Sequence, residues 1–328
     1  TWRVTEGWKH LTSSWGKVVP KDSTIKRDLV HAKDWFANFL IPKGYTAVVP
    51  TMEKITIRQD QLDANPPIPL EPDWRSIHLH LKQWASDGLK HPNPRVSYWR
   101  ECFRHFVLVS YQAGTRPLEL LGEVEKVRKI AADGSASVEK KIRSGLRWED
   151  VEIDMATHVN DVSGKEFQKS VATLYVRESK TGVPREVPCN AGDFLIRWRK
   201  YCDNYRKEQG LRPLNKSDYV FFNPYTDQPY SYTHFYRTWD EMRERLKDEL
   251  SPVRSNQKYT IYSLRSSYIT NQIEEGKDIY LIKKITGHSL ELLHRHYDRS
   301  DVRKRSAEAV QRTYAKTLKR PNAIDLEN

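Results

Sequence analysis

Several features are scarce or missing in these 328 residues, and each absence excludes a class of protein. No apolar run approaches the ~18 residues that a membrane-spanning helix needs. The longest blocks are as short as Phe106–Val109, and mean hydropathy is -0.76. The three cysteines form no CxxC pair, which argues against a disulfide framework or a zinc ribbon and favours a reducing compartment. We therefore expect a cytoplasmic protein without a membrane partner.

Common catalytic motifs are missing as well. No GxxxxGK(S/T) or GxGxxG loop is present to hold a nucleotide, and no HExxH or HxE…PCxxC arrangement to hold zinc. His78 with His80, and His294 with His296, fall in predicted helices, where residues two apart point about 200° away from each other. The carboxylates are scattered and do not suggest a magnesium-dependent nuclease. The sequence therefore predicts neither a metal site nor a cofactor.

What the chain does have is enough apolar residues for a core and an excess of positive charge. It is 38% hydrophobic and 30% charged, its length suggests two domains, and its formal charge is +12. Residues 1–88 carry 12 basic and 10 acidic residues, so nearly all the excess lies beyond them. Such an excess is typical of proteins that bind a polyanion, most often nucleic acid, although a solvated helix face is the alternative. The missing initial Met suggests that the sequence starts inside a longer protein.

The hydrophobic pattern predicts a mainly α protein with a small antiparallel β-sheet, an α+β fold. Residues 1–70 read as a helical domain that ends in the Pro-rich segment 65–72, and residues 71–328 as a second domain. The charged stretch 122–144 looks like an insertion. Strands are expected at 146–153 and 173–177, and the second turns back at 181–184 into 185–188. Helices return after Pro229, and the tail 298–328 is basic and amphipathic, with eight basic and two acidic residues in 299–320.

A sparse set of cations and hydrogen-bond donors stands at the joints between these elements. Arg116 lies between Gly114 and Pro117, where the backbone must be extended as a helix begins. Each member of the set also has an ordinary structural role open to it. Arg116 could form a salt bridge with Glu119, and Lys180 could lie in a solvated turn. His288 could cap a helix, and Tyr297 could be an aromatic residue of the core.

Together these residues resemble the tyrosine recombinases, the phage integrase family. Residues 113–121, AGTRPLELL, resemble the first arginine box, and the acidic residue three positions on is present as Glu119. Residues 146–151 look like the strand that follows it, and SKTG at 179–182 like the hairpin that carries the family's lysine. YSLR at 262–265, TGHS at 286–289 and HY at 296–297 are similar to the HxxR box, the later histidine box and the nucleophile. Tyr262 departs from the family pattern, since most members have His there, and the 122–144 segment is longer than usual.

The resemblance implies a helical core-binding domain that clamps DNA opposite a catalytic domain. It also implies a site-specific recombinase or integrase that forms a 3′-phosphotyrosine intermediate without metal or ATP. The implied catalytic residues are Arg116, Lys180, Tyr262, Arg265, His288 and the nucleophile Tyr297, with Glu119 in support. The expected partners are double-stranded recombination sites, a homotetramer assembled on DNA and possible accessory DNA-bending proteins, in a bacterial or phage-encoded setting. The alternatives are a type IB topoisomerase-like enzyme and a DNA-binding protein with a decayed active site, which Tyr262 leaves open.

Overall fold

A computed structural model of the chain describes residues 22–52, 54–57, 65–130, 136–143, 145–159, 164, 166–177, 183–253 and 257–297. For 123–130, 136–143, 158–159 and 294–297 it describes the backbone alone. Contacts within the chain divide it into two compact units. The first is Thr1–Ala64 with Val253–Lys258, and the second is Asn65–Pro252 with Tyr259–Asn328.

The described part of the first unit is dominated by one helix, α2 (Asp22–Trp35), which continues as a wider turn through Phe36–Leu40. This confirms the predicted helix, which ends before Pro42 and Gly44. Trp35 and Phe39 stack with ring centroids 6.2 Å apart, and about half of each side chain is exposed. This unit therefore presents aromatic surface.

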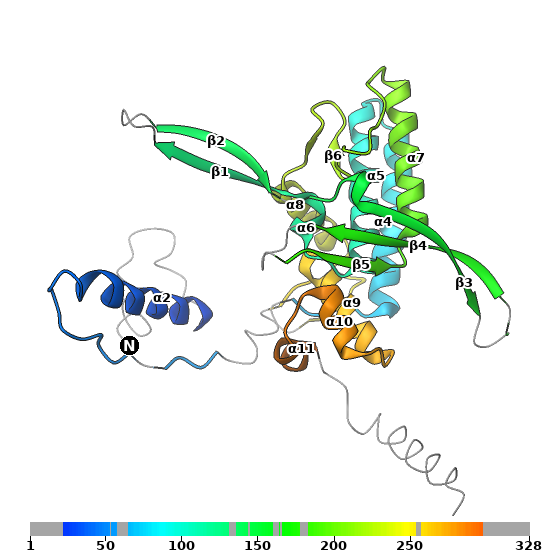
Figure 1. The fold of residues 1–328 in the computed structure, drawn as a ribbon. Coiled ribbons are helices and arrows are strands. Elements are labelled where there is room, and N and C mark those ends of the chain that lie inside the picture. Colours follow the sequence, from blue (N-terminus) through cyan, green and yellow to red (C-terminus); the bar gives the residue numbers. More distant parts are fainter. Residues whose placement is uncertain are drawn as a thin grey trace, which may run out of the picture. The chain divides into compact units, whose positions relative to one another are not determined.

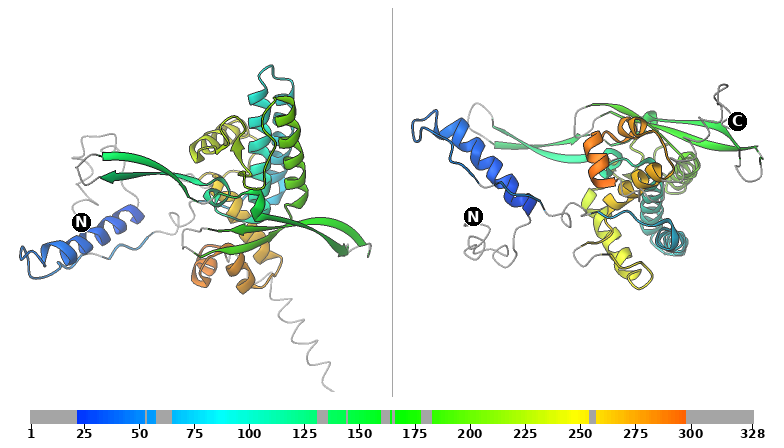
Figure 2. Two further views of the ribbon diagram at one scale, coloured as in Figure 1. Left: turned by 45° about the horizontal axis from the view of Figure 1, so that its top comes forward. Right: turned by 90° about the horizontal axis from the view of Figure 1, so that it is seen from below.

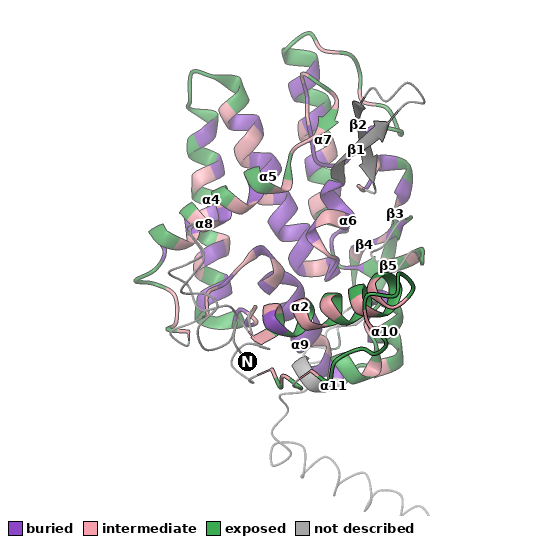
Figure 3. Ribbon diagram, turned by 90° about the vertical axis from the view of Figure 1, so that its left-hand side faces the viewer, coloured by how far each residue is buried: buried purple, intermediate pink, exposed green. Residues whose placement is uncertain are grey.

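Helices make up most of the second unit (Figure 1). They are α4 (Arg75–Leu89), α5 (Pro94–Ala113), α6 (Pro117–Leu121), α7 (Gly192–Glu208), α8 (Tyr232–Arg245), α9 (Ile261–Glu274), α10 (Ile279–Thr286) and α11 (Leu290–Tyr297). Helices α5 and α9 are buried along most of their length and form its centre, as the purple ribbons of Figure 3 show. The helix that begins after Arg116 and the helices after Pro229 were expected from the sequence. Helix α7 was not, although its apolar stripe at Leu195, Trp198, Cys202 and Tyr205 is legible there.

The ends of α5, α6 and α10 follow from local chemistry. Asn93 caps α5, because its side-chain oxygen accepts a hydrogen bond from the Arg95 N–H at 3.0 Å. Gly114 ends α5 in the left-handed conformation, with φ of 60°. Pro117 then starts α6 and holds Arg116 extended, as predicted. Gly287 ends α10 in the same left-handed way, with φ of 69°.

The small sheet is antiparallel and has the order β3 (Val151–Val159), β4 (Glu166–Val176), β5 (Arg185–Cys189). Val176 pairs with Arg185, which confirms the predicted hairpin. The strand predicted at 146–153 starts later, at Val151, because Trp148–Asp150 form a tight turn. The Asp150 carboxylate stabilises that turn by accepting a hydrogen bond from the Arg147 N–H at 3.1 Å.

The predicted insertion forms a two-stranded antiparallel ribbon, β1 (Glu123–Ile130) with β2 (Ala136–Arg143). It is a sheet of its own and extends away from the helices of the second unit (Figures 1 and 2). It joins the second unit between α6 and Leu146, directly after the segment that contains Arg116.

The Pro-rich segment 65–72 lies with the second unit, because the division between the units falls at Ala64 and Asn65. The Ile68 N–H donates to the Ser267 hydroxyl of α9 at 2.8 Å, and the Ile68 side chain is buried. Asp73 is also buried, and it accepts hydrogen bonds from Ser251 and from the Tyr259 hydroxyl at 2.6 Å. The roles predicted for residues 1–70 and 71–328 stay predictions.

These elements confirm the predicted α+β class, mainly helical with a small antiparallel sheet. No helix among the described residues has the length and apolar content to cross a membrane.

We predict that Gly114→Ala destabilises the chain by about 2–5 kcal/mol. An added Cβ would lie 2.1 Å from the Tyr268 ring, and the left-handed backbone adds strain. Gly276→Ala is the matched control, because Gly276 also has a positive φ, of 74°, but nothing within 4 Å of an added Cβ. We expect it to cost only about 1–2 kcal/mol in denaturant unfolding. Equal losses for both variants would show that the contact with Tyr268 is unimportant.

Candidate active site

Arg116 stands at the start of α6 with most of its side chain covered, 17% being exposed. Its Nη1 donates to Glu119 Oε1 at 2.9 Å, and its backbone N–H donates to Glu119 Oε2 at 2.7 Å. The short helix therefore closes on itself through one carboxylate. Among the described residues, no hydrogen bond is made by the other guanidinium nitrogens of Arg116, so they can still bind a ligand.

Glu119 also joins α6 to the hairpin strand β5. Arg185 of β5 donates to both of its oxygens, from Nη1 to Oε1 at 3.0 Å and from Nη2 to Oε2 at 2.5 Å. The remaining donor of Arg185, Nε, reaches the Ile285 carbonyl of α10 at 2.7 Å. Both Glu119 and Arg185 are buried. This two-pronged pairing fixes the carboxylate more firmly than a single contact would.

Ionisation of Glu119 is opposed by burial and favoured by its neighbours. Burial alone would raise the pKa of the carboxyl. The hydrogen bonds and charge of Arg185, the Arg116 N–H and the charge of Arg265 outweigh it and lower that pKa below the ordinary 4.5. Glu119 is therefore an anion among three arginines, Arg116, Arg185 and Arg265, and the cluster keeps a net positive charge.

Arg265 projects from the central helix α9 and is only 3% exposed. Its Nη1 donates to the Gly114 carbonyl at 2.6 Å, and its Nη2 donates to the Thr286 carbonyl at 2.6 Å. These carbonyls belong to the ends of α5 and α10, where the left-handed turns leave them without helical partners. Arg265 thus connects two helix ends that lie far apart in the sequence.

His288 follows the turn at Gly287 and is half-buried. Its Nδ1 lies 3.2 Å from Arg265 Nη2 and 3.2 Å from the Thr286 hydroxyl oxygen. The structure therefore brings four predicted residues, Arg116, Glu119, Arg265 and His288, into one connected network.

The other three predicted residues are described to different extents. Tyr262 lies on α9 one turn before Arg265 and is half-buried. Burial, together with the nearby Tyr262 hydroxyl, raises the pKa of Tyr232 to about 12. Tyr297 is the last residue of α11, of which only the backbone is described. Lys180 lies outside the described residues, within the connection between β4 and β5.

Sequence reasoning missed Arg185 as a member of the site. The residue was placed in the returning hairpin strand, and its spacing gave no sign that it faces Glu119, 66 positions away. One signal was available. A strand residue that packs beside buried Val187 and Cys189 is an unusual place for an arginine unless it is paired.

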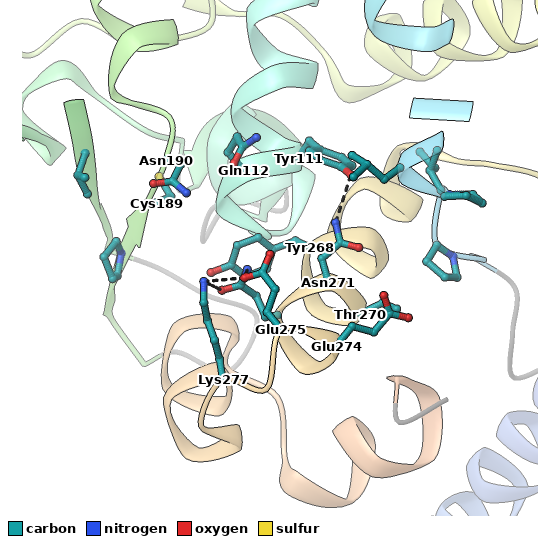
Figure 4. Close-up of a pocket in the computed structure, with 17 residues that line it drawn as sticks. Tyr111, Gln112, Cys189, Asn190, Tyr268, Thr270, Asn271, Glu274, Glu275 and Lys277 are labelled. Carbon is teal, nitrogen blue, oxygen red and sulfur yellow. Dashed lines mark hydrogen bonds and ion pairs between the residues drawn. The ribbon is translucent and has the colours of Figure 1, made fainter. Parts of the chain in front are cut away.

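A pocket of about 910 Å³ opens beside the network, between α5, α9, β5 and the segment at Pro67–Leu70. Figure 4 shows Tyr111, Tyr268 and Asn271 in its wall, with the Asn271 amide donating to the Tyr111 hydroxyl at 3.2 Å. Arg116, Glu119, Arg265 and His288 do not line it. The cations of the candidate site therefore lie outside this pocket.

The network is suited to binding an anion with several oxygens. It supplies guanidinium and imidazole donors, and Glu119 anchors Arg116 without cancelling all of the charge. No group of three or more His, Cys, Asp or Glu that could hold a metal ion occurs in the part of the chain that the structure describes.

A family profile and several solved structures are similar to this chain. The profile of the phage integrase family matches residues 143–304. The XerH site-specific recombinase bound to its difH substrate before cleavage has a similar structure, with a TM-score of 0.53 at 13% identity, covering 94% of this chain and 67% of that one. The Tn1549 transposon integrase (residues 82–397) in complex with circular intermediate DNA gives a TM-score of 0.52 at 15% identity, covering 94% and 82%. The chain spans 55% of the XerH chain in its post-cleavage complex. A search of curated protein sequences found no significant match.

Residues 143–304 of the chain are a phage integrase domain, and the members of this family are the tyrosine recombinases. The likeness to the solved structures, at 13% and 15% identity, is a likeness of fold.

We predict that Glu119→Gln lowers the free energy of unfolding by about 3–5 kcal/mol at pH 7, because it leaves buried Arg185 without its counter-charge. The pKa of Glu119 is lowered by folding, so its stabilisation is complete above pH 4.5 and is lost as the pH falls further. The difference between the variant and the wild type should therefore shrink below about pH 4.5.

The matched control is Glu149→Gln, which removes a carboxylate paired with Arg177 at the surface. We expect a change within about 1 kcal/mol for that variant. A pH-independent loss for Glu119→Gln in urea titrations would contradict the assigned ionisation.

Proposed function

We propose that this chain is a site-specific DNA recombinase that cuts and rejoins DNA through a 3′-phosphotyrosine intermediate on Tyr297. The observation that carries the proposal is the network in which Arg265 binds the carbonyl of Gly114, two residues before Arg116, and also reaches His288. Two arginines and a histidine from separate segments converge where a phosphate diester can be gripped.

The Tyr297 hydroxyl gives up its proton to solvent, and its oxygen attacks the phosphorus. The bond to the 5′ oxygen breaks, that oxygen takes a proton from Lys180, and the phosphate stays on the tyrosine as a diester. Arg116 and Arg265 neutralise the non-bridging oxygens while the phosphorus is pentacoordinate, and His288 adds a donor. Rejoining reverses these steps, because the phosphotyrosine conserves the bond energy and ATP is not needed.

Lys180 supplies the proton for the departing 5′ oxygen in this proposal. A lysine near two arginines has its pKa lowered by their charge, which favours proton donation. In this proposal Tyr262, one turn from Arg265, either hydrogen-bonds the phosphate or helps Tyr297 lose its proton. Because an unperturbed phenol has a pKa of about 10, Tyr262 is a poor general base.

The remaining parts of the chain have roles in the same proposal. The unit that contains α2 clamps the DNA opposite the catalytic domain, and its exposed aromatic residues suit a contact surface. Four copies assemble on two duplexes to exchange strands, and the basic tail 298–328 docks on a neighbouring copy. Accessory DNA-bending proteins assist where the recombination site requires them. The relatives described above were solved on DNA substrates, which supports recombination sites as the partner.

The most informative test is covalent trapping on a nicked suicide duplex that carries a recombination site. A trapped complex supports the enzyme, whereas tight binding without a complex favours a DNA-binding protein with a decayed site. Relaxation of supercoiled DNA by a monomer, without need of a particular sequence, would favour the topoisomerase-like alternative.

We predict that Tyr297→Phe binds DNA with unchanged affinity but forms no covalent complex, because the variant lacks the attacking oxygen. Denaturing gels of the trapped product measure this directly. Tyr314→Phe is the matched control and should trap DNA normally. An adduct that persists in Tyr297→Phe and disappears in Tyr314→Phe would move the nucleophile to Tyr314.

We predict that Lys180→Ala slows cleavage by roughly 10²- to 10⁴-fold, the usual effect of losing a general acid. A substrate with a 5′-bridging sulfur should rescue this variant, because a thiolate leaves without a proton. It should not rescue Arg116→Ala or Arg265→Ala, which lose charge stabilisation of the phosphate oxygens. Equal rescue of all three variants, or none for Lys180→Ala, would assign the acid to His288 or Tyr262.

A further inference from the structure

The ribbon β1–β2 distributes charge unequally between its two faces. In an antiparallel pair, residues directly opposite each other share a face and successive residues alternate. The register pairs odd-numbered residues with odd and even-numbered with even, as in Glu123 with Arg143 and Val124 with Ile142. The two faces can therefore be named by the parity of their residue numbers.

The odd-numbered face balances its own charge. Glu123 lies opposite Arg143, and Glu125 lies opposite Lys141. The complete face has three acidic and three basic residues, the remaining two being Lys129 and Glu139. Opposite charges across a strand pair stabilise a ribbon, so this face needs no external partner.

The even-numbered face has three basic residues and no acidic one. Lys126 lies directly opposite Lys140, a like-charge pair that destabilises a ribbon unless an external anion neutralises it. Arg128 is the next residue along the same face. The other positions of this face are apolar, Val124, Ile130, Ala136, Val138 and Ile142. Charged residues can protect an exposed strand edge from pairing with another strand. This does not explain why the two faces differ in charge, because both faces belong to the same two strands.

The root of the ribbon is fixed beside the candidate site. Its strands leave the second unit at Gly122 and Gly145, with φ of 77° and 94°. A Cβ on Gly145 would lie 3.1 Å from the Gly122 Cα, so the two backbones are in close contact there. The Leu146 N–H donates to the Leu120 carbonyl of α6 at 3.1 Å. Because Arg116 begins α6, the direction of the ribbon is tied to the element that holds the first arginine.

We propose that the even-numbered face of β1–β2 binds the phosphate backbone of double-stranded DNA beyond the cleavage position. Eight residues per strand reach about 25 Å, which corresponds to roughly seven base pairs of duplex. The ribbon therefore adds up to three phosphate contacts outside the active site. This inference rests on the proposed function only in taking duplex DNA as the substrate.

The experiment compares two triple variants of the full chain that remove the same charge. The test variant is Lys126→Gln with Arg128→Gln and Lys140→Gln, and the matched control is Lys129→Gln with Lys141→Gln and Arg143→Gln. Equilibrium binding is measured against salt on a recombination-site duplex that extends 12 base pairs beyond the cleavage position on both sides. It is repeated on duplexes cut back to about two base pairs on either side in turn.

We expect the test variant to reduce the slope of log affinity against log salt by about 2.7, which is 0.9 for each lost contact. The control should change the slope by less than about 0.9. One of the two truncations should abolish the difference between the test variant and the wild type, because it removes the DNA that the ribbon contacts. Covalent trapping by the test variant at saturating protein should match the wild type.

Three outcomes would overturn the inference. Equal slope changes in both variants would indicate unspecific attraction to a basic ribbon, and an unchanged slope in the test variant would show that the face does not bind DNA. Loss of self-association without DNA, with the slope unchanged, would assign the face to a second copy. A wild type that shows the expected slopes but traps no DNA would refute the proposed function and leave the ribbon contact intact.

Discussion

A single buried carboxylate holds the candidate active site together. Glu119 pairs with Arg116 in its own helix and with both outer nitrogens of Arg185 in the hairpin strand. The third donor of Arg185 binds the carbonyl of Ile285, two residues before the turn at Gly287. The first arginine box, the hairpin and the histidine turn are therefore positioned by one ion, whose removal would leave buried arginines to repel one another.

The two arginines of the proposed phosphate site are built differently. Arg265 is almost wholly buried and bound to two backbone carbonyls, which hold its position at the junction of α5, α9 and α10. Arg116 keeps part of its guanidinium exposed and is fixed on one side by Glu119. A rigid inner cation and a more accessible outer one together fit a ligand that must be gripped while its charge rises.

The insertion adds a two-stranded ribbon to the second unit without changing its three-stranded sheet. The ribbon leaves the second unit through two glycines in close backbone contact, so its strands neither widen the sheet β3–β4–β5 nor interrupt α6. One face of the ribbon has three basic residues and no acidic one. The root next to α6 keeps that extension in a fixed relation to Arg116.

The sequence by itself determined most of the local structure. Helix periodicity, the joint from Gly114 to Pro117, and the turn before Arg185 depend on residues close in the chain, so they could be predicted. The order of the five boxes also predicted the family, whose profile matches residues 143–304. Tertiary structure decided the rest. Arg185 pairs with Glu119, which is 66 positions away in the chain. Arg265 donates to the Gly114 carbonyl, which is 151 positions away. A local sequence pattern does not predict contacts between residues so far apart in the chain. They form only when α5 and α9 are buried and the ends of the surrounding elements come together.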